Sequence, residues 1–238
     1  MFVLLLFVTL GFAGSALAQS AEKVTPEMRG DIFMARKMYR EAVDAYKDGP
    51  KGDPVLLNKI GIAYHQMMDL QTAKKYYVEA IRAKGNYPEA INNLGTVYYA
   101  SKSYRRAITQ YKKALRYSPD SASIYSNLGT AYFARKDYKD ASTCYEKALA
   151  LDPNVFESRS TTGVLLQERS VEERAKFHYY LSKTYAKAGD KDHALEYMRK
   201  SIEEGFKEKK KFQEDPEFAK LRDLPEFKEL LALEPRVL

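Results

Sequence analysis

The sequence predicts an all-α solenoid of stacked antiparallel helix pairs, about five in number. The stretch from Ile91 to Pro119 recurs 34 residues later, from Tyr125 to Pro153. Self-similarity at a period of 20 to 50 residues is the signature of repeat architectures. Small residues and chain breakers also recur at fixed offsets within this period, as close-packed helix pairs require. Hydrophobic residues make up 45% of the 238 residues, enough for a continuous core.

The first eighteen residues, Met1 to Ala18, resemble a secretory signal peptide. An apolar run is followed by small residues and the cleavage-type pattern Ala16-Leu17-Ala18. We expect cleavage after Ala18 and export of the remaining chain to the periplasm or the medium. No Lys or Arg lies near Met1, so an uncleaved membrane anchor stays open as the alternative.

Four repeats follow, each marked by a glycine and an aromatic residue three positions later. The glycines are 31, 34 and 34 residues apart. Small residues let two helix backbones approach closely, an aromatic side chain fills the space beside the contact, and Pro or Gly ends the unit. One unit cannot bury its apolar face alone, so the units must stack. The repeat glycines, with the Ala and Tyr that follow at 12 and 16 residues, are Gly30, Ala42 and Tyr46; Gly61, Ala73 and Tyr77; Gly95, Ala107 and Tyr111; Gly129, Ala141 and Tyr145.

An interruption at about residues 154–170 separates the fourth unit from a fifth. The fifth unit resumes with Ser182 and Tyr185, 53 residues after their counterparts, which is one period plus 19. Ser170 and Glu173 form a capping-box pattern, which predicts a helix from Val171 to about Ala188. The inserted segment is either a hairpin turning at residues 161–163 or a loop, and it is either a ligand contact or a linker.

The C-terminal segment, 209–238, is predicted to cap the solenoid. Gly205 ends the last unit, and two short helices are expected at about 216–222 and 226–232. The run Lys209–Lys211 is either a solvated turn or a contact for an anionic partner. The side chains expected to pack back onto the fifth unit are Phe218, Leu221, Phe227 and Leu230.

These motifs resemble the tetratricopeptide repeat family. The resemblance is carried by Leu94-Gly95-x-x-Tyr98 with Ala107, Tyr111, Ala114 and Pro119, and by Leu128-Gly129-x-x-Tyr132 with Ala141, Tyr145, Ala148 and Pro153. It implies a right-handed superhelix over residues 23–208, with units at about 23–53, 54–87, 88–121, 122–155 and 175–208.

The resemblance also implies a binding groove, because the first helix of each unit lines the concave face in that family. Amide side chains can both donate to and accept from an extended peptide. Asn93 and Asn127 occupy one position in successive units, where they either meet a peptide or join neighbouring helices. Carried over, the groove residues are Asn58, Lys59, His65 and Gln66; Asn92, Asn93, Thr96 and Tyr99; Ser126, Asn127, Thr130 and Phe133; and Tyr179, Tyr180, Lys183 and Lys187.

Catalytic and metal-binding motifs are missing from the sequence. It holds no G-x-S-x-G, no phosphate-binding loop and no H-E-x-x-H, and its three histidines occupy unrelated repeat positions. We therefore expect no enzyme activity, no cofactor and no metal. The single cysteine, Cys144, is expected to be a small buried hydrophobe.

The net charge is +7, with an isoelectric point near 9.1. A nucleic-acid partner is not expected for an exported chain. The sequence thus favours a scaffold that binds a peptide or helix of another envelope or secreted protein. The alternative is an electrostatic binder of anionic envelope lipid or polysaccharide that uses the Lys-rich end.

Overall fold

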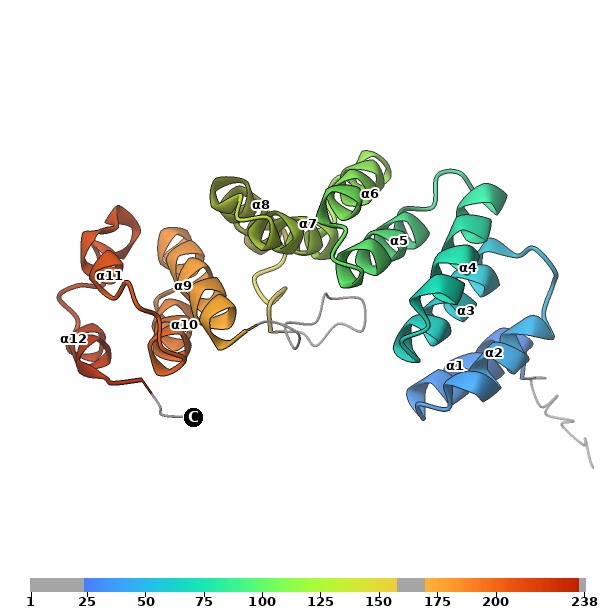
Figure 1. Cartoon of the computed structure of the whole chain (residues 1–238), viewed down its shortest axis with the longest axis horizontal. Coiled ribbons are helices and arrows are strands. Elements are labelled where there is room, and N and C mark those ends of the chain that lie inside the picture. Colours follow the sequence, from blue (N-terminus) through green and yellow to red (C-terminus); the bar gives the residue numbers. More distant parts are fainter. Residues whose placement is uncertain (1–23, 158–169, 236–238) are drawn as a thin grey trace, which may run out of the picture.

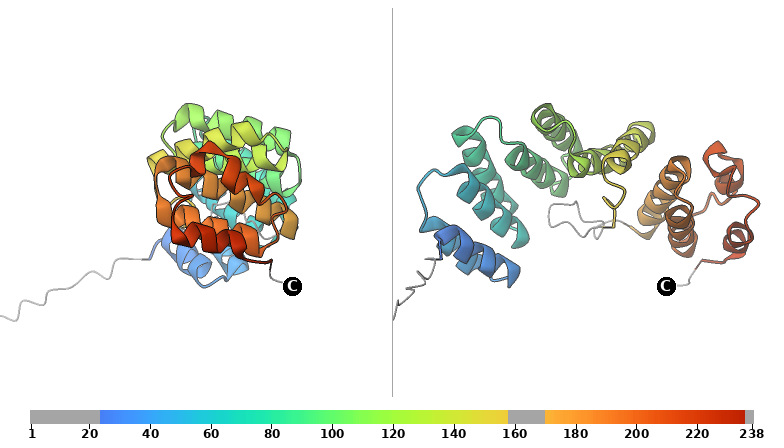
Figure 2. Two further views of the ribbon diagram at one scale, coloured as in Figure 1. Left: turned by 90° about the vertical axis from the view of Figure 1, so that its left-hand side faces the viewer. Right: turned by 180° about the vertical axis from the view of Figure 1, so that it is seen from behind.

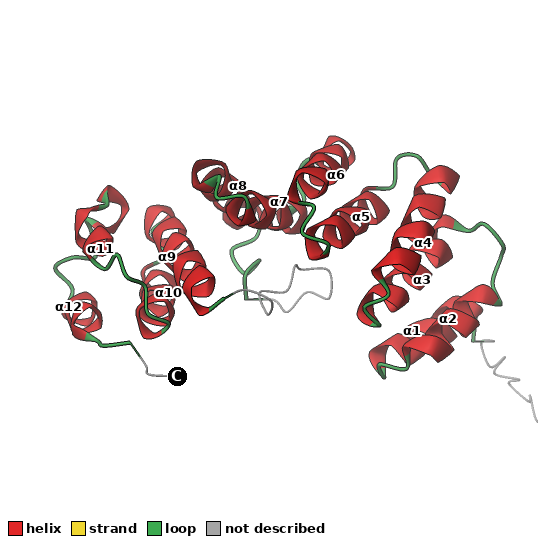
Figure 3. Ribbon diagram, viewed as in Figure 1, coloured by secondary structure: helices red, strands yellow, loops and turns green. Residues whose placement is uncertain are grey.

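The computed structural model describes residues 24–157 and 170–235. The expected signal peptide and the alternative hairpin at 161–163 lie outside these residues. The described part contains twelve α-helices and one 3-10 helix, and no strand (Figure 1, Figure 3). The predicted all-α solenoid is confirmed.

Ten of the helices form five antiparallel pairs. Within each pair a short turn joins the helices, and the second helix of one pair packs against the first helix of the next. The pairs are α1 (Pro26–Ala35) with α2 (Tyr39–Lys47), α3 (Pro54–Gln66) with α4 (Leu70–Ala83), α5 (Pro88–Ala100) with α6 (Tyr104–Tyr117), α7 (Ala122–Ala134) with α8 (Tyr138–Leu151), and α9 (Val171–Ala188) with α10 (Lys191–Glu203).

Caps fix the starts of α1 and α9, and the start predicted at Val171 is confirmed. The Thr25 hydroxyl accepts a hydrogen bond from the Met28 amide, 3.1 Å away, and Pro26 opens α1. Ser170 and Glu173 form both halves of a capping box at the start of α9. These contacts satisfy amides that have no partner within the helix.

The turns inside the first four pairs share a strained backbone. Each contains one residue other than glycine in the left-handed region, at φ between 55° and 68°. Such a conformation costs an L-residue about 1 kcal/mol or more. The fifth pair has Gly189 (φ 84°) in the corresponding turn, where no such cost arises. The residues concerned in the first four turns are Lys37, Met68, Lys102 and Lys136.

Each repeat glycine lies directly against the ring of its tyrosine. A Cβ added to Gly95 would lie 2.5 Å from the Tyr111 ring, and the other three glycines show the same close approach. In the fifth pair, Ser182 and Met198 take these places, and the Ser182 hydroxyl donates to the Ala194 carbonyl at 2.7 Å. The flexible methionine leaves room for a side chain where tyrosine does not.

The C-terminal cap differs from the predicted pair of helices. It consists of α11 (Lys210–Glu214), the 3-10 helix η2 (Pro216–Phe218) and α12 (Pro225–Ala232). The expected helix at 216–222 is wrong, because only the 3-10 turn forms there, and α11 was missed. Phe212, which is fully buried, anchors α11. Asp215 is extended because Pro216 follows it, and this separates α11 from η2.

The predicted packing of the cap is confirmed. Phe218 and Phe227 are almost completely buried, in the same cluster as Tyr185 and Met198 of the fifth pair. Leu221 and Leu230 belong to this cluster as well. The cap therefore covers the apolar side of the last pair, which would otherwise face water.

The five pairs and the cap form an arch (Figures 1 and 2). In its middle, α5 and α7 lie on the inner side and α6 and α8 on the outer side. We use the term inner face for the side of the arch on which α5 and α7 lie. No helix in the described ranges is long and apolar enough to cross a membrane.

Candidate functional site

A ladder of asparagine side chains joins the first helices of successive pairs. Asn93 Nδ2 donates to Asn58 Oδ1 at 3.0 Å, and Asn127 Nδ2 donates to Asn92 Oδ1 at 3.0 Å. In both bonds the donor lies two residues before the glycine of its own repeat. The acceptor lies three residues before the glycine of the preceding repeat. All four side chains are buried. The amides therefore make helix-to-helix contacts, the alternative that the sequence left open, and any role in binding must be additional.

Charged groups occupy the same ladder position at the N-terminal end. Lys59 stands two residues before its repeat glycine, and its Nζ lies 2.7 Å from Oε1 of Glu27, three residues before Gly30. A second carboxylate, Asp31, lies 2.6 Å from the same ammonium. The Tyr46 hydroxyl donates to Asp31 at 2.7 Å. We call Glu27, Asp31, Tyr46 and Lys59 the N-terminal ion cluster.

A similar cluster closes the C-terminal end. Lys183 Nζ lies 2.8 Å from Asp215 and 3.2 Å from Glu217, both in the cap. The Tyr179 hydroxyl also donates to Asp215. We call Lys183, Asp215, Glu217 and Tyr179 the C-terminal ion cluster. Each cluster holds one lysine and two carboxylates, so each carries a net charge of −1.

The pKa values show that both lysines stay charged. Burial by itself would lower the pKa of Lys59, but its hydrogen bonds to Asp31 and Glu27 outweigh burial and raise the pKa. The pKa of Lys183 is also raised, because its hydrogen bonds to Asp215 and Glu217 outweigh the lowering by burial. Burial by itself would raise the pKa of Asp215. Hydrogen bonds from Lys183 and Tyr179 outweigh burial and hold this pKa below its ordinary value. Lys59, Lys183 and Asp215 are therefore charged at neutral pH.

The two threonines beside the ladder bond within the fold. The Thr96 hydroxyl donates to the Asn93 carbonyl at 2.8 Å, one turn back in α5. The Thr130 hydroxyl accepts from the Tyr145 hydroxyl at 3.5 Å. Both side chains are buried. Thr130 therefore links α7 to α8, whereas Thr96 bonds within its own helix.

The other predicted groove positions differ in exposure. Gln66 is exposed, and His65, Tyr99 and Ser126 are partly exposed. Burial lowers the pKa of His65, so its ring is neutral at pH 7. Phe133 is buried, with its ring edge-on to Phe177 of the fifth pair.

The predicted groove residues of the fifth pair do not continue the ladder. Tyr179 is 2% exposed and stacks on Phe206 at a centroid distance of 4.6 Å, so its burial assigns it to the cap contact. Tyr180 stacks on Tyr138 at 5.0 Å and does not reach Ser126 with a hydrogen bond. The described part of the chain therefore brings together the ladder residues of the second, third and fourth pairs. Lys183 belongs with the cap, and Lys187 pairs with Glu146 at 2.7 Å.

Sequence reasoning missed the carboxylates of both ion clusters. Glu27 occupies the repeat position of Asn58 and Asn92, so the spacing alone could have identified it as the partner of Lys59. Asp215 and Glu217 lie outside the repeat, and no periodic signal marks them.

The described residues hold no group of three or more His, Cys, Asp or Glu side chains arranged to bind a metal ion. Cys144 is buried as predicted, and burial raises its pKa to about 12, so the thiol is a poor nucleophile at neutral pH.

Three family models match the sequence. A model described as TPR repeat matches residues 95–134, and a tetratricopeptide repeat model matches residues 122–155. A further tetratricopeptide repeat model matches twice, at residues 55–87 and 175–204. The second match places the fifth repeat after the interruption. No curated protein matches the chain in sequence.

Solved structures with a similar fold include two of MamA. A crystal structure of MamA aligns with a TM-score of 0.51 at 20% identity, over 74% of this chain and 93% of MamA. MamA from Desulfovibrio magneticus RS-1, residues 41 to the end, aligns with a TM-score of 0.51 at 23% identity, over 73% and 89%. At these identities the similarity shows a shared fold.

Proposed function

Because the chain belongs to the tetratricopeptide repeat family, we propose that it is a non-catalytic scaffold that binds an extended segment of another protein along its inner face. The observation that supports this proposal is the asparagine ladder between two ion clusters. The ladder offers a neutral polar strip. The N-terminal ion cluster adjoins it, the C-terminal ion cluster lies beyond it at the cap, and each cluster carries a net charge of −1.

The chemistry of the amides suits a peptide backbone. Each amide side chain has two N–H donors and an oxygen with two lone pairs. The ladder bond uses one donor of Asn93 and one lone pair of Asn58. Asn58 also bonds to Tyr87, so the groups left to pair with an extended segment are those of Asn93. A ladder already fixed by its own bonds needs little ordering when a ligand arrives, which favours affinity.

The negative ends favour a ligand with positive charge near one or both termini of the bound segment. Glu27 and Asp31 have half-exposed side chains, so a ligand can reach them without burying an unpaired charge. We therefore expect a neutral or basic peptide to bind more strongly than an acidic one.

Binding is tested with a peptide selected by the wild-type protein from a display library. We expect Asn93→Ala and Asn127→Ala to weaken the affinity at least about tenfold, since each removes groups worth about 1.4 kcal/mol or more. The matched control is Asn86→Ala, an exposed asparagine outside the ladder. Unchanged affinity in both ladder variants would refute the groove.

A second variant separates binding from folding. Ser126 is partly exposed on α7, where it forms no side-chain hydrogen bond within the described residues. We expect Ser126→Tyr to block the inner face while leaving the ladder bonds intact. Loss of peptide binding with an unchanged unfolding curve supports the groove, and full binding by this variant contradicts it.

We also propose that the protein works outside the cytoplasm, and that its partner is an envelope or secreted protein. Support comes from the signal-like sequence at residues 1–18. The mass of the purified protein tests cleavage after Ala18. A cytoplasmic, full-length product after cell fractionation would contradict export.

A further inference from the structure

Positive charge is concentrated on one helix of the outer side. The 14 residues of α6 include five cations and no carboxylate, against a net charge of +7 for the whole chain. The five are Arg105, Arg106, Lys112, Lys113 and Arg116.

These cations are not neutralised by their surroundings. Arg105, Arg106, Lys112 and Arg116 are exposed, and none forms an ion pair with a carboxylate in residues 24–157 or 170–235. Lys112 lies over the Tyr132 ring, with its Nζ 5.5 Å from the ring centroid, and Asp140 of α8 acts on it electrostatically without forming an ion pair. The positive charge of this face is therefore not cancelled by ion pairs within the described residues.

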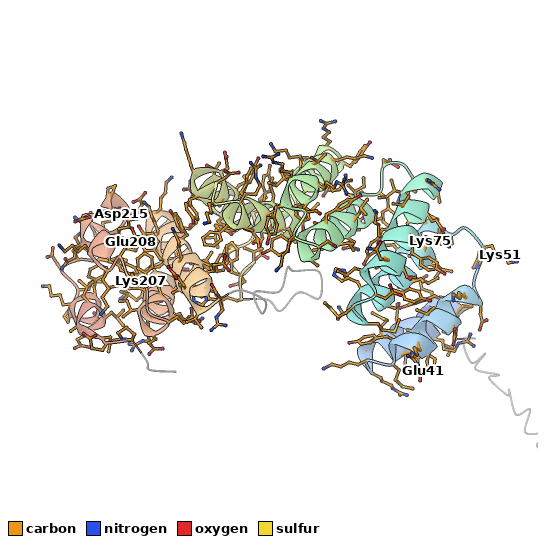
Figure 4. The ribbon with its side chains drawn as sticks, in the orientation of Figure 1. Glu41, Lys51, Lys75, Lys207, Glu208 and Asp215 are labelled. Atoms are coloured by element: carbon orange, nitrogen blue, oxygen red, sulfur yellow. The ribbon has the colours of Figure 1, made fainter. Side chains whose placement is uncertain are left out.

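The Lys-rich end that the sequence suggested for anion binding is different. Lys211 pairs with Glu208 at 2.6 Å, and Lys207 pairs with Glu172 at 3.5 Å. Lys209 donates to the Leu233 carbonyl. Figure 4 shows Lys207 and Glu208 at the capped end of the arch. Local partners thus reduce the charge that this run can offer to a ligand.

The α6 cations form a line. Arg105, Lys112 and Arg116 are separated by seven and four residues, so they share one face of the helix. At a rise of 1.5 Å per residue, they span about 16 Å. Tyr117, which is 48% exposed, follows Arg116 in the sequence but lies about 100° around the helix from it. On α4, the second helix of the preceding pair, Lys75 (Figure 4) and Arg82 are exposed as well.

We propose that this outer face of α6, defined by Arg105, Lys112 and Arg116, docks on an anionic lipid bilayer. A planar surface touches a convex arch at its crown, and α6 lies there (Figures 1 and 2). Basic residues near an anionic bilayer add attraction one by one. Docking in this orientation leaves the inner face open to a peptide.

The test is cosedimentation with vesicles of phosphatidylcholine, with and without phosphatidylglycerol. We expect binding only to the anionic vesicles. The triple variant Arg105→Gln, Lys112→Gln and Arg116→Gln should bind about 100-fold more weakly, since each basic residue contributes about fivefold. Gln keeps helix propensity, and circular dichroism checks that the variant is folded.

The matched control removes the same charge elsewhere. Lys210, Lys220 and Lys228 are exposed residues of the cap region. Their triple change to Gln should leave vesicle binding within about threefold, because interactions beyond a Debye length of about 10 Å are screened. Equal losses in both triple variants would overturn the proposed surface and leave only a net-charge effect.

Two further outcomes would overturn the bilayer as the occupant. One is equal binding to vesicles without phosphatidylglycerol. The other is tighter binding to duplex DNA than to anionic vesicles, lost in the same α6 variant, which would make the face a nucleic-acid surface.

Discussion

The four N-terminal helix pairs and the capped fifth pair achieve the same architecture with different side chains. In the first four, a glycine meets a tyrosine ring and polar groups join successive pairs. In the fifth, Ser182 and Met198 replace that contact, and aromatic rings join the pair to its neighbours. The helix-pair geometry therefore tolerates different contacts, provided that volume is conserved across the helix interface.

The junction between the two regions shows the change most clearly. Ser126 has no amide to continue the ladder, and Phe177 instead packs edge-on against Phe133 and Tyr145. Aromatic packing depends on area and shape, so it does not need the fixed repeat register that an asparagine pair requires. The junction thus accommodates the break in periodicity at residues 154–170.

The largest expected effect comes from removing an aromatic anchor of the capped region. Phe212→Ala should destabilise the cap by about 4 kcal/mol, because the ring is fully buried among aromatic neighbours. Hydrogen exchange should rise in α9–α12 and stay unchanged in α1–α4, since repeat proteins couple through nearest neighbours. Equal acceleration at both ends would show that the two regions unfold as one unit.

Substitution of a repeat glycine should have the next largest effect. Gly95→Ala should cost about 2 kcal/mol, because the new Cβ would lie 2.5 Å from the Tyr111 ring. Adding Tyr111→Met, the choice of the fifth pair, should make the glycine change less costly. A double-mutant cycle by urea denaturation measures this coupling. If the losses of stability were purely additive, methionine would not make room for a side chain at the glycine position, which would contradict the comparison with Ser182 and Met198.

The hydrogen bond between Asn93 and Asn58 should contribute less to the stability of the fold. Asn93→Ala leaves the buried Asn58 amide without its partner and should cost about 1.5 kcal/mol. Asn58→Ala should cost about the same, and the double variant should cost less than the sum. Tyr180→Ala at the corresponding position of the fifth pair should show no coupling to Ser126→Ala. Coupling there would mean that the polar ladder continues across the junction.

The turns offer a smaller test of the same comparison. Lys102→Gly should stabilise the protein by about 1 kcal/mol, because a residue at φ 55° is relieved of strain. Gly189→Ala, at φ 84°, should destabilise it by about 1 kcal/mol. Thermal unfolding measures both shifts. Effects of the same sign would contradict the assignment of strain to the first four turns.

The smallest effect concerns acid. The folded pKa of Asp215 lies below its ordinary 3.8, so its stabilising contribution is complete above that pH and is lost as pH falls through the folded value. Hydrogen exchange of the cap should therefore increase below about pH 4. In Asp215→Asn this part of the pH dependence should disappear. An unchanged pH dependence of exchange in that variant would show that Asp215 does not cause the loss of cap stability in acid.

The fold could be predicted largely from the sequence because packing residues repeat at fixed spacing. Gly95 and Gly129 identify equivalent helices without any knowledge of the neighbours. The cap was harder, since Phe212 and Asp215 occur once and no second copy shows their role. Pro216 could be read as a helix start, yet tertiary burial of Phe212 decided where the preceding helix formed.

The candidate site could be predicted only in part. The repeat register identified Asn93 and Asn127, but their bonds to Asn58 and Asn92 depend on how one pair rotates against the next. The basic face of α6 was missed because its cations are separated in the sequence and gather only on the folded helix. The contiguous run Lys209–Lys211 stands out in the sequence instead, although local partners engage Lys209 and Lys211.

The central claim is that a peptide binds along the asparagine ladder, and the side-chain amides report on it directly. The chain holds six asparagines, of which Asn86 and Asn154 lie outside the ladder. In a nuclear magnetic resonance titration with the selected peptide, we expect the side-chain NH2 signals of the four ladder residues to shift and those of Asn86 and Asn154 to stay in place. Saturable binding that leaves the signals of Asn58, Asn92, Asn93 and Asn127 unmoved would contradict the claim.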